Sequence, residues 1–203
     1  LDTQLTKAEA LRTFGLEPSK KTILIVGGSL GARTINDSVM AHLDELQNSG
    51  VQVIWQTGKN YFENIKQQLA EKSPMPALKP TDFIADMGAA YRAADLVISR
   101  AGASSISEFC LIGKPVILVP SPNVAEDHQT KNAMALVNRQ AAQFVSDAEA
   151  PQKLIPLALS TVKDDQILGQ LSHNIKLMAL RNSAETIANE VFALAEKQAN
   201  KKR

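Results

Sequence analysis

Short apolar runs alternate along this chain with segments in which apolar residues recur at the spacing of a helix. The runs lie at 22–26, 51–55, 95–98, 115–119 and, more weakly, 142–145. Continuous apolar runs rich in β-branched residues are typical of strands buried on both faces, as in a parallel sheet. Because helical segments separate the runs, the pattern predicts an α/β fold with a doubly wound, Rossmann-like parallel sheet.

The helical segments are expected between and after these runs. One helix is expected to follow the first run, with apolar positions at Ile35, Val39, Leu43 and Leu46. Others are expected at 7–14, 61–71, 88–94, 106–112, 129–137, 148–159, 165–180 and 183–198. A proline-broken segment through Pro74, Pro76 and Pro80 is assigned no strand. With no repeat and no internal linker, residues 1–203 are expected to form one domain with a helical C-terminal extension.

The turn that follows the run at 95–98 is the strongest candidate for a ligand site. Gly102 and Ala103 allow a ligand to approach the backbone, and the serines at 104, 105 and 107 offer hydroxyl donors and helix caps. A helix N-terminus in that position presents unpaired N–H groups and a positive dipole end to an anion. Glu108, one turn further on, is placed to accept hydrogen bonds from a sugar diol. The alternative is an ordinary capped helix, since Ser105 and Glu108 also have the spacing of a capping box.

A second glycine-rich turn, Gly27–Arg33, follows the run at 22–26 and also precedes a helix. It suits a phosphate, but it does not match the dinucleotide fingerprint, because the first glycine spacing fails. The turns after Val26, Ile84, Ile98 and Val119 are all expected at the carboxyl edge of the sheet, where ligands bind in such folds. The last of these turns leads to polar groups that include Glu126, Asp127, His128, Gln129 and Asn132.

Composition excludes several classes of function. A net charge of +1 gives no reason to expect nucleic acid. The lone Cys110 forms no internal disulfide and is expected to be a small buried side chain. The three histidines are far apart in the sequence and suggest no metal site. His42 and His173 are expected at the surface, and His128 near a ligand. The chain shows no membrane span or signal peptide, and its start at Leu1 is expected for a piece of a longer protein.

Several motifs together resemble the MurG family, the N-acetylglucosaminyltransferases that complete lipid II in bacterial cell-wall synthesis. They occur in order, with natural spacing, and span nearly the whole chain: Gly27–Arg33, Phe83–Met87, Tyr91–Ala103, Glu108, Gly113–Pro115 and Asp127–Ala133. The resemblance implies the C-terminal, donor-binding half of a two-domain GT-B glycosyltransferase. It implies UDP-N-acetylglucosamine as donor and no bound metal or other cofactor for the chemistry. Ser104 and Ser105 depart from the family's usual pair, although the hydroxyl at 105 is retained.

The resemblance also implies roles for particular residues. Ser29 would contact the donor diphosphate together with the backbone and hydroxyl groups of the segment that begins the helix, namely Ala103, Ser104, Ser105, Ile106 and Ser107. The main chain at Ile84 would read the uracil edge, with Met87 packed nearby. Glu108 would hold the ribose hydroxyls. Gln129, with His128, would bind the hydroxyls of N-acetylglucosamine, although a helix-capping role for Gln129 is the alternative.

The acceptor, lipid I, the catalytic base and most membrane contact would belong to an N-terminal domain outside these residues. The full enzyme would be peripheral on the cytoplasmic face of the plasma membrane, and this piece alone would bind donor weakly and turn over negligibly. Two alternatives remain. One is the catalytic half of a two-subunit transferase that uses the same donor. The other is a non-catalytic nucleotide-sugar or NAD-binding module, which the absent fingerprint disfavours for NAD.

Overall fold

The computed structural model describes residues 4–123, 127–180, 188 and 191–192 of the chain. The strands found there form one sheet in the order β3-β2-β1-β4-β5-β6, with every neighbouring pair parallel. They are β1 (Thr22–Val26), β2 (Gln52–Gln56), β3 (Leu78–Thr81), β4 (Leu96–Ser99), β5 (Val116–Leu118) and β6 (Gln143–Phe144). The sequence prediction of a parallel, doubly wound sheet is therefore confirmed.

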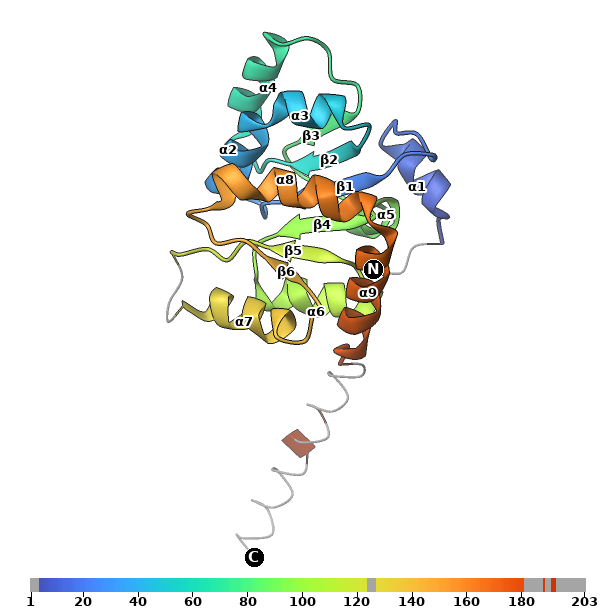
Figure 1. Ribbon diagram of the computed structural model, residues 1–203, viewed down its shortest axis with the longest axis vertical. Helices are drawn as coiled ribbons and strands as arrows, with labels where there is room; N and C mark the ends of the chain where they lie inside the picture. The colour runs from blue at the N-terminus through green and yellow to red at the C-terminus, as the bar shows by residue number, and fades with distance from the viewer. Residues whose placement is uncertain (1–3, 124–126, 181–187, 189–190, 193–203) are drawn as a thin grey trace, which may run out of the picture.

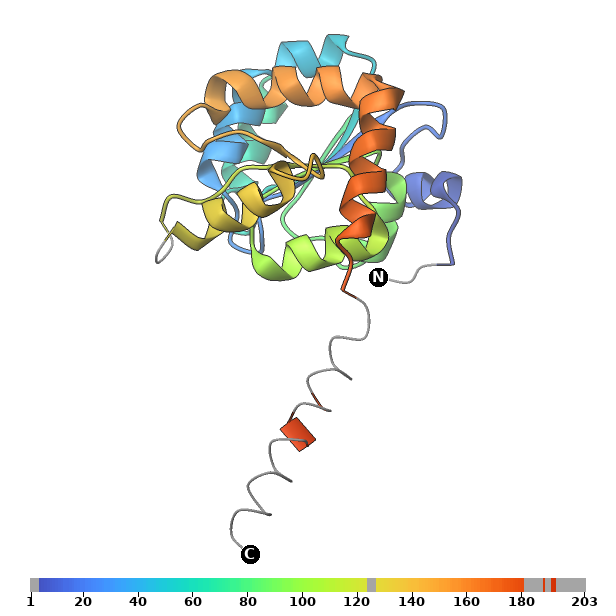
Figure 2. The ribbon, with the colours of Figure 1, turned by 60° about the horizontal axis from the view of Figure 1, so that its bottom comes forward.

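Helices cover both faces of this sheet, as the edge-on view in Figure 2 shows. They are α1 (Lys7–Thr13), α2 (Arg33–Ala41), α3 (Leu43–Asn48), α4 (Phe62–Ala70), α5 (Met87–Ala93), α6 (Ala103–Ile112), α7 (His128–Val137), α8 (Ala150–Lys163) and α9 (Asp165–Leu177). Side chains alternate along each strand, so Ile23 and Ile25 pack beneath α2, α3, α4 and α8 while Leu24 faces α1, α5, α6 and α7. Helix α9 starts on the first face and ends on the second, with Leu168 in one core and Ile175 in the other.

Strand order reverses between β1 and β4, which pair from Ile23 with Leu96 to Val26 with Ser99. The turns that follow these two strands, and the turn after β5, lie along the same edge of the sheet, on the left in Figure 1. Ligands of open α/β sheets bind in the crevice outside such a reversal. The fold therefore brings the two glycine-containing turns predicted to bind phosphate to adjacent positions.

The strand β3 is absent from the sequence prediction, which assigned the proline-broken segment no strand. Leu78 is buried, and backbone bonds of 2.8 Å from the Val53 N–H to the Ala77 carbonyl and 2.9 Å from the Thr57 N–H to the Thr81 carbonyl join the segment to β2. A proline removes one N–H, which an edge strand tolerates because one side of it has no partner strand. Pro80 is accepted in this position for that reason.

The predicted single helix after the first turn is in fact two helices, because α2 ends at Ala41 and α3 begins at Leu43. At the break, Nδ1 of His42 lies 2.9 Å from the Ser38 carbonyl oxygen. His42 is partly buried, so its prediction as a surface residue is wrong, while His173 is exposed as predicted.

Helix α8 runs to Lys163, beyond the predicted end at 159, and α9 ends at Leu177 before the predicted 180. Apart from residues 188, 191 and 192, the predicted helix at 183–198 lies outside the described residues.

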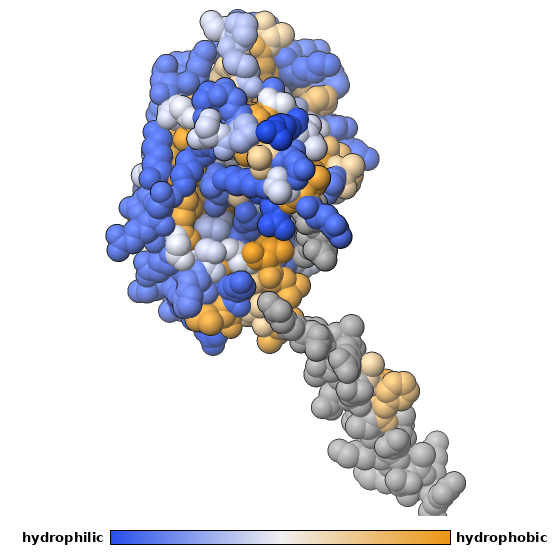
Figure 3. Space-filling view, turned by 90° about the vertical axis from the view of Figure 1, so that its right-hand side faces the viewer, coloured by the Kyte–Doolittle hydropathy of each residue, from blue (hydrophilic) through white to orange (hydrophobic). Residues whose placement is uncertain are grey.

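The side of the molecule that carries α1 and α9 is mixed in polarity, as Figure 3 shows. Apolar surface gathers there beside the point at which the chain leaves the described part of α9. Leu177 and Leu180 are both largely exposed in this region.

Candidate functional site

The N-terminus of α6 faces the carboxyl edge of the sheet immediately after β4. Gly102 precedes the helix with φ −70° and ψ 142°, and it has no side chain with which to cap it. The first bond of the helix runs from the Ile106 N–H to the Gly102 carbonyl, at 3.0 Å. The N–H groups of residues 103–105 therefore precede the helical ladder and point out of it, as an anion site requires.

The capping-box alternative at Ser105 and Glu108 is wrong, because the helix begins two residues before Ser105. Ser104 is exposed and Ser105 partly buried, so both remain near the helix end. The hydroxyl of Ser107 instead donates to the Ala103 carbonyl at 3.0 Å, inside the helix. The Ile106 side chain packs against the apolar core. Ile106 and Ser107 therefore have structural partners, whereas Ala103, Ser104 and Ser105 carry the outward-facing donors.

The turn after β1 places a second helix N-terminus next to the first. Ser29 is exposed on this turn, and Ala32, which precedes α2, makes no side-chain cap. Gly31 has φ +91°, and a Cβ there would lie 2.3 Å from the Thr57 carbonyl oxygen. Glycine is required at 31 because the turn packs directly on the turn after β2. The N-termini of α2 and α6 thus flank the reversal in strand order.

Glu108, the predicted ribose ligand, lies one turn into α6 and is partly buried. The hydroxyl of Tyr91 on α5 donates to its Oε2 at 2.9 Å. Burial, and then the neighbouring Glu108, raise the pKa of Tyr91 well above its usual value, so this hydroxyl stays a donor. Tyr91 also meets the Phe109 ring edge-to-face with 5.8 Å between centroids. One carboxylate oxygen is thereby fixed while the other can accept from a ligand.

The predicted uracil-reading segment lies between β3 and α5. Ile84 is buried, Met87 is partly buried and Phe83 is half-exposed. Asp86 caps the helix that follows by accepting from the Ala89 N–H at 2.8 Å. Phe83, Ile84 and their neighbours line a pocket of about 300 Å³. The segment is thus held in place at both ends, with a hollow beside it.

Gln129 joins the two turns that follow β4 and β5. Its Oε1 accepts from the Ser121 N–H at 2.9 Å and from the Ala101 N–H at 3.3 Å. Asn132 supports the same turn by donating to the Ala101 carbonyl at 3.2 Å. The oxygen of Gln129 is thus used to hold the site together, and its amide nitrogen is the part suited to a ligand hydroxyl. His128 is exposed at the start of α7 and has interactions of its own.

Sequence reasoning missed two features of this site. One is the role of Tyr91, which begins the motif Tyr91–Ala103 but was assigned no part in the site. The other is a bridge of Arg100, Asp147 and Thr34, whose members are far apart in sequence. Arg100 belongs to a motif that was noted, but nothing in the spacing linked it to Asp147.

The described residues contain no cluster of three or more potential metal ligands. No helix among them is long and apolar enough to cross a membrane. Cys110 is buried as predicted, and its burial raises the pKa of the thiol.

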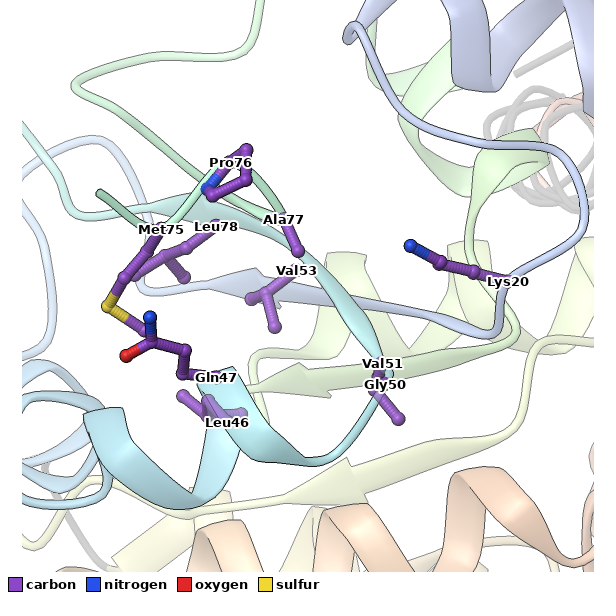
Figure 4. Close-up of a pocket in the computed structure, with 10 residues that line it drawn as sticks. All are labelled: Lys20, Leu46, Gln47, Gly50, Val51, Val53, Met75, Pro76, Ala77 and Leu78. Atoms are coloured by element: carbon purple, nitrogen blue, oxygen red, sulfur yellow. The ribbon is translucent and has the colours of Figure 1, made fainter. Parts of the chain in front are cut away.

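A separate pocket of about 200 Å³ opens at the amino edge of the sheet, between α3 and the segment before β3. Figure 4 shows its largely apolar wall, to which none of the predicted site residues contributes.

The fold and the paired helix N-termini define a Rossmann-like α/β domain with a candidate ligand site at its topological switch. The chain belongs to the family described as the glycosyltransferase family 28 C-terminal domain, whose model matches residues 22–187. The predicted family resemblance is confirmed. The roles that it implies for individual residues stay predictions.

Curated relatives carry the name UDP-N-acetylglucosamine–N-acetylmuramyl-(pentapeptide) pyrophosphoryl-undecaprenol N-acetylglucosamine transferase. The one from Phocaeicola vulgatus is 61% identical over 193 residues, which are 95% of this chain and 51% of that protein. The one from Porphyromonas gingivalis strain W83 is 52% identical over 198 residues, 96% of this chain and 52% of that protein. The chain thus spans about half the length of the curated relatives it matches.

Solved structures agree with this assignment. MurG of Acinetobacter baumannii superposes with a TM-score of 0.77 at 28% identity, over 86% of this chain and 52% of that one. HepE of Anabaena, solved with UDP-glucose, has a TM-score of 0.69 at 18% identity, over 97% of this chain and 54% of that one. The second likeness shows the fold alone. The predicted fold class, one Rossmann-like half of a GT-B glycosyltransferase, is confirmed.

Proposed function

We propose that this chain is the donor-binding part of a transferase that moves N-acetylglucosamine from UDP-N-acetylglucosamine to lipid I, giving lipid II. The observation that carries the proposal is the pair of outward-facing helix N-termini at the strand reversal, with the Glu108 carboxylate held one turn away by Tyr91. The names of the relatives supply the identity of donor and acceptor.

The donor would lie along the carboxyl edge of the sheet. Its diphosphate would accept from the N–H groups of residues 103–105 and from the turn that carries Ser29. The ribose diol would donate to the free oxygen of Glu108, and the uracil edge would meet the main chain at Ile84. The sugar hydroxyls would meet the amide nitrogen of Gln129 and the ring of His128.

The chemistry would be an inverting displacement. An acceptor hydroxyl attacks the anomeric carbon as the bond from that carbon to the UDP oxygen breaks, and the hydroxyl proton goes to a base that we expect outside this chain. Negative charge builds on the leaving diphosphate. The aligned N–H groups of α6 stabilise that charge, because they are already oriented toward it before reaction. In the full protein this reaction would take place on the cytoplasmic face of the plasma membrane.

Calorimetric titration with UDP-N-acetylglucosamine, UDP-glucose and NADH tests the proposal on this chain and on the full-length protein. We expect saturable binding that prefers the N-acetyl sugar, and no binding of NADH. Glu108→Ala should weaken binding about 10- to 100-fold, because a hydrogen bond to a charged group contributes about 1.5–3 kcal/mol. The matched control is Glu63→Gln in the first turn of α4, which removes an exposed carboxylate elsewhere.

Turnover separates the remaining alternatives. The full-length protein should transfer the sugar to lipid I, whereas this chain alone should show negligible turnover. Binding without transfer by the full-length protein would favour a non-catalytic module and contradict the proposal. Preference for NADH over UDP would refute it outright.

A further inference from the structure

The guanidinium of Arg100 joins the carboxyl ends of two neighbouring strands. Arg100 follows β4 directly, and its Nη1 donates to the carbonyls of Val119 and Pro120, just after β5, at 3.1 and 3.2 Å. The same nitrogen forms an ion pair with Oδ1 of Asp147 in the loop between β6 and α8. Only 19% of the Arg100 side chain and 20% of the Asp147 side chain is exposed. Both charges are therefore largely removed from water and held by protein partners.

Asp147 extends this contact to α2. Its second oxygen, Oδ2, accepts from the Thr34 hydroxyl at 2.9 Å, and Thr34 is the second residue of that helix. A chain of three side chains thus runs from the turn after β4 to the first turn of α2. A carboxylate held at a helix N-terminus is also favoured by the helix dipole.

The bridge joins the two helix N-termini of the candidate site. Arg100 lies two residues before Gly102, which precedes α6, and Thr34 lies two residues after Ala32, which precedes α2. The backbone pairing of β1 with β4 ends at Val26 and Ser99, before either turn begins. Beyond that point no strand pairing joins the two turns, and this bridge of side chains spans them.

We infer that Arg100 and Asp147 are positioning residues that hold the N-termini of α2 and α6 at the separation a nucleoside diphosphate requires. The inference rests on the proposed function, since it assumes that both helix ends meet the diphosphate. The two residues act through the helices and not by touching the ligand. Asp147 provides the decisive test, because its charge and its position predict opposite effects on an anion.

Removing a carboxylate near a phosphate site should tighten phosphate binding if electrostatics alone matters. Loss of the bridge should weaken it, because the helix N–H groups would no longer converge. The affinities of wild type, Asp147→Asn, Thr34→Val and the double variant are measured by calorimetry for UDP and for uridine. Asp37→Asn is the matched control. It removes an exposed carboxylate from α2, the helix that carries Thr34, and leaves the bridge intact.

We expect Asp147→Asn to weaken UDP binding about tenfold and uridine binding less than twofold. Thr34→Val should give a smaller loss of UDP affinity and should likewise spare uridine binding. The fold-loss of affinity in the double variant should be smaller than the product of the two single fold-losses, as is usual for residues of one hydrogen-bond network. Asp37→Asn should bind UDP as wild type does or slightly tighter. Thermal melting confirms that each variant is folded, and the milder Thr34→Val serves if Asp147→Asn is not.

The outcomes separate the two proposals. Full-length wild type that binds neither UDP nor uridine contradicts the proposed function itself. Wild type that binds UDP, together with an Asp147→Asn variant that binds it equally or more tightly, overturns the positioning role alone. Equal losses for UDP and uridine would also overturn it, since they would show a general loss of structure.

Discussion

The Tyr91 hydroxyl donates to Oε2 of Glu108 across 2.9 Å, joining α5 to the first turns of α6. Because burial and Glu108 hold the pKa of Tyr91 well above its ordinary value, the donor persists throughout the neutral and mildly alkaline range. The contact leaves Glu108 one oriented oxygen for the ligand. The residue predicted to bind ribose is thus positioned by Tyr91, which lies in a motif of the family resemblance but was assigned no role from the sequence.

Tyr91→Phe should weaken UDP binding about fivefold, because a Glu108 carboxylate that is no longer oriented should lose about 1 kcal/mol of its interaction with the ribose, a part of the full hydrogen-bond energy. The preference for UDP over 2′-deoxy-UDP should shrink by a similar factor if Glu108 holds the ribose diol. The melting temperature should change little, since phenylalanine retains the edge-to-face contact with Phe109. Titrations with both nucleotides measure the ratio. An unchanged ratio would argue against a ribose-binding role for Glu108.

Gly102 and Gly31 give a matched pair of glycine substitutions. Gly102 has φ −70°, and a Cβ there would meet just the Ser105 Oγ, at 3.9 Å, so neither backbone nor packing requires glycine. We expect Gly102→Ala to leave the melting temperature nearly unchanged and to weaken UDP binding tenfold or more, because the methyl group occupies the approach to the helix N–H groups.

Gly31→Ala should have the opposite effect, a large loss of folding stability. Its φ of +91° and the 2.3 Å approach of a Cβ to the Thr57 carbonyl oxygen predict loss of about 2–4 kcal/mol of folding stability. Urea denaturation of both variants checks the contrast. If Gly102→Ala binds UDP as wild type does, the diphosphate does not approach α6 at this point.

The strand–turn–helix order and the parallel sheet could be predicted because buried strands and helices carry distinct apolar spacings. Strand β3 could not be predicted, because it is short, contains Pro80 and buries few side chains besides that of Leu78. Its formation depends on pairing with β2, a tertiary effect that local spacing does not record. The break at His42 escaped prediction for a related reason, since the apolar positions of α2 and α3 continue one helical stripe.

Some residues of the candidate site could likewise be predicted from the sequence, and others could not. Ala103, Ser104 and Glu108 could be selected because turn chemistry and strand ends are local features, whereas Ser29 was selected through the family resemblance. The Arg100–Asp147–Thr34 bridge could not, because Thr34 and Asp147 are brought together by the packing of α2 against α8. The dual use of Gln129 also needed the structure, since its oxygen bonds two turns that are 20 positions apart in sequence, at Ala101 and Ser121.

Gln129→Glu separates the structural and ligand-binding roles of this side chain. A carboxylate can still accept from the Ala101 and Ser121 N–H groups, so the turns should keep their arrangement. It cannot donate to a sugar hydroxyl. We expect UDP affinity to fall less than threefold, while the additional affinity for UDP-N-acetylglucosamine over UDP is lost. Titration with both ligands is the measurement, and a retained sugar contribution would assign Gln129 to structure alone.

Lys114 provides a prediction about pH. It donates to the Ala94 carbonyl in a partly buried position, and this burial lowers its pKa to about 8, with Lys7 and Arg92 adding to the effect and Asp95 opposing it. Below pH 8 both folded and unfolded chains bind the proton, and the folded state bears the cost of a partly buried cation. Between about pH 8 and the ordinary lysine value of 10.5, the unfolded chain still binds the proton but the folded chain does not.

The free energy of unfolding should therefore rise with pH in that window, relative to a Lys114→Met variant. We expect the difference between the two proteins to grow by about 2 kcal/mol from pH 7.5 to 9.5. Urea denaturation at intervals of half a pH unit measures it. Tyr91, whose raised pKa gives a loss of stability only above pH 10, is present in both proteins and cancels. A difference that stays constant across the window would show that Lys114 remains charged in the folded protein.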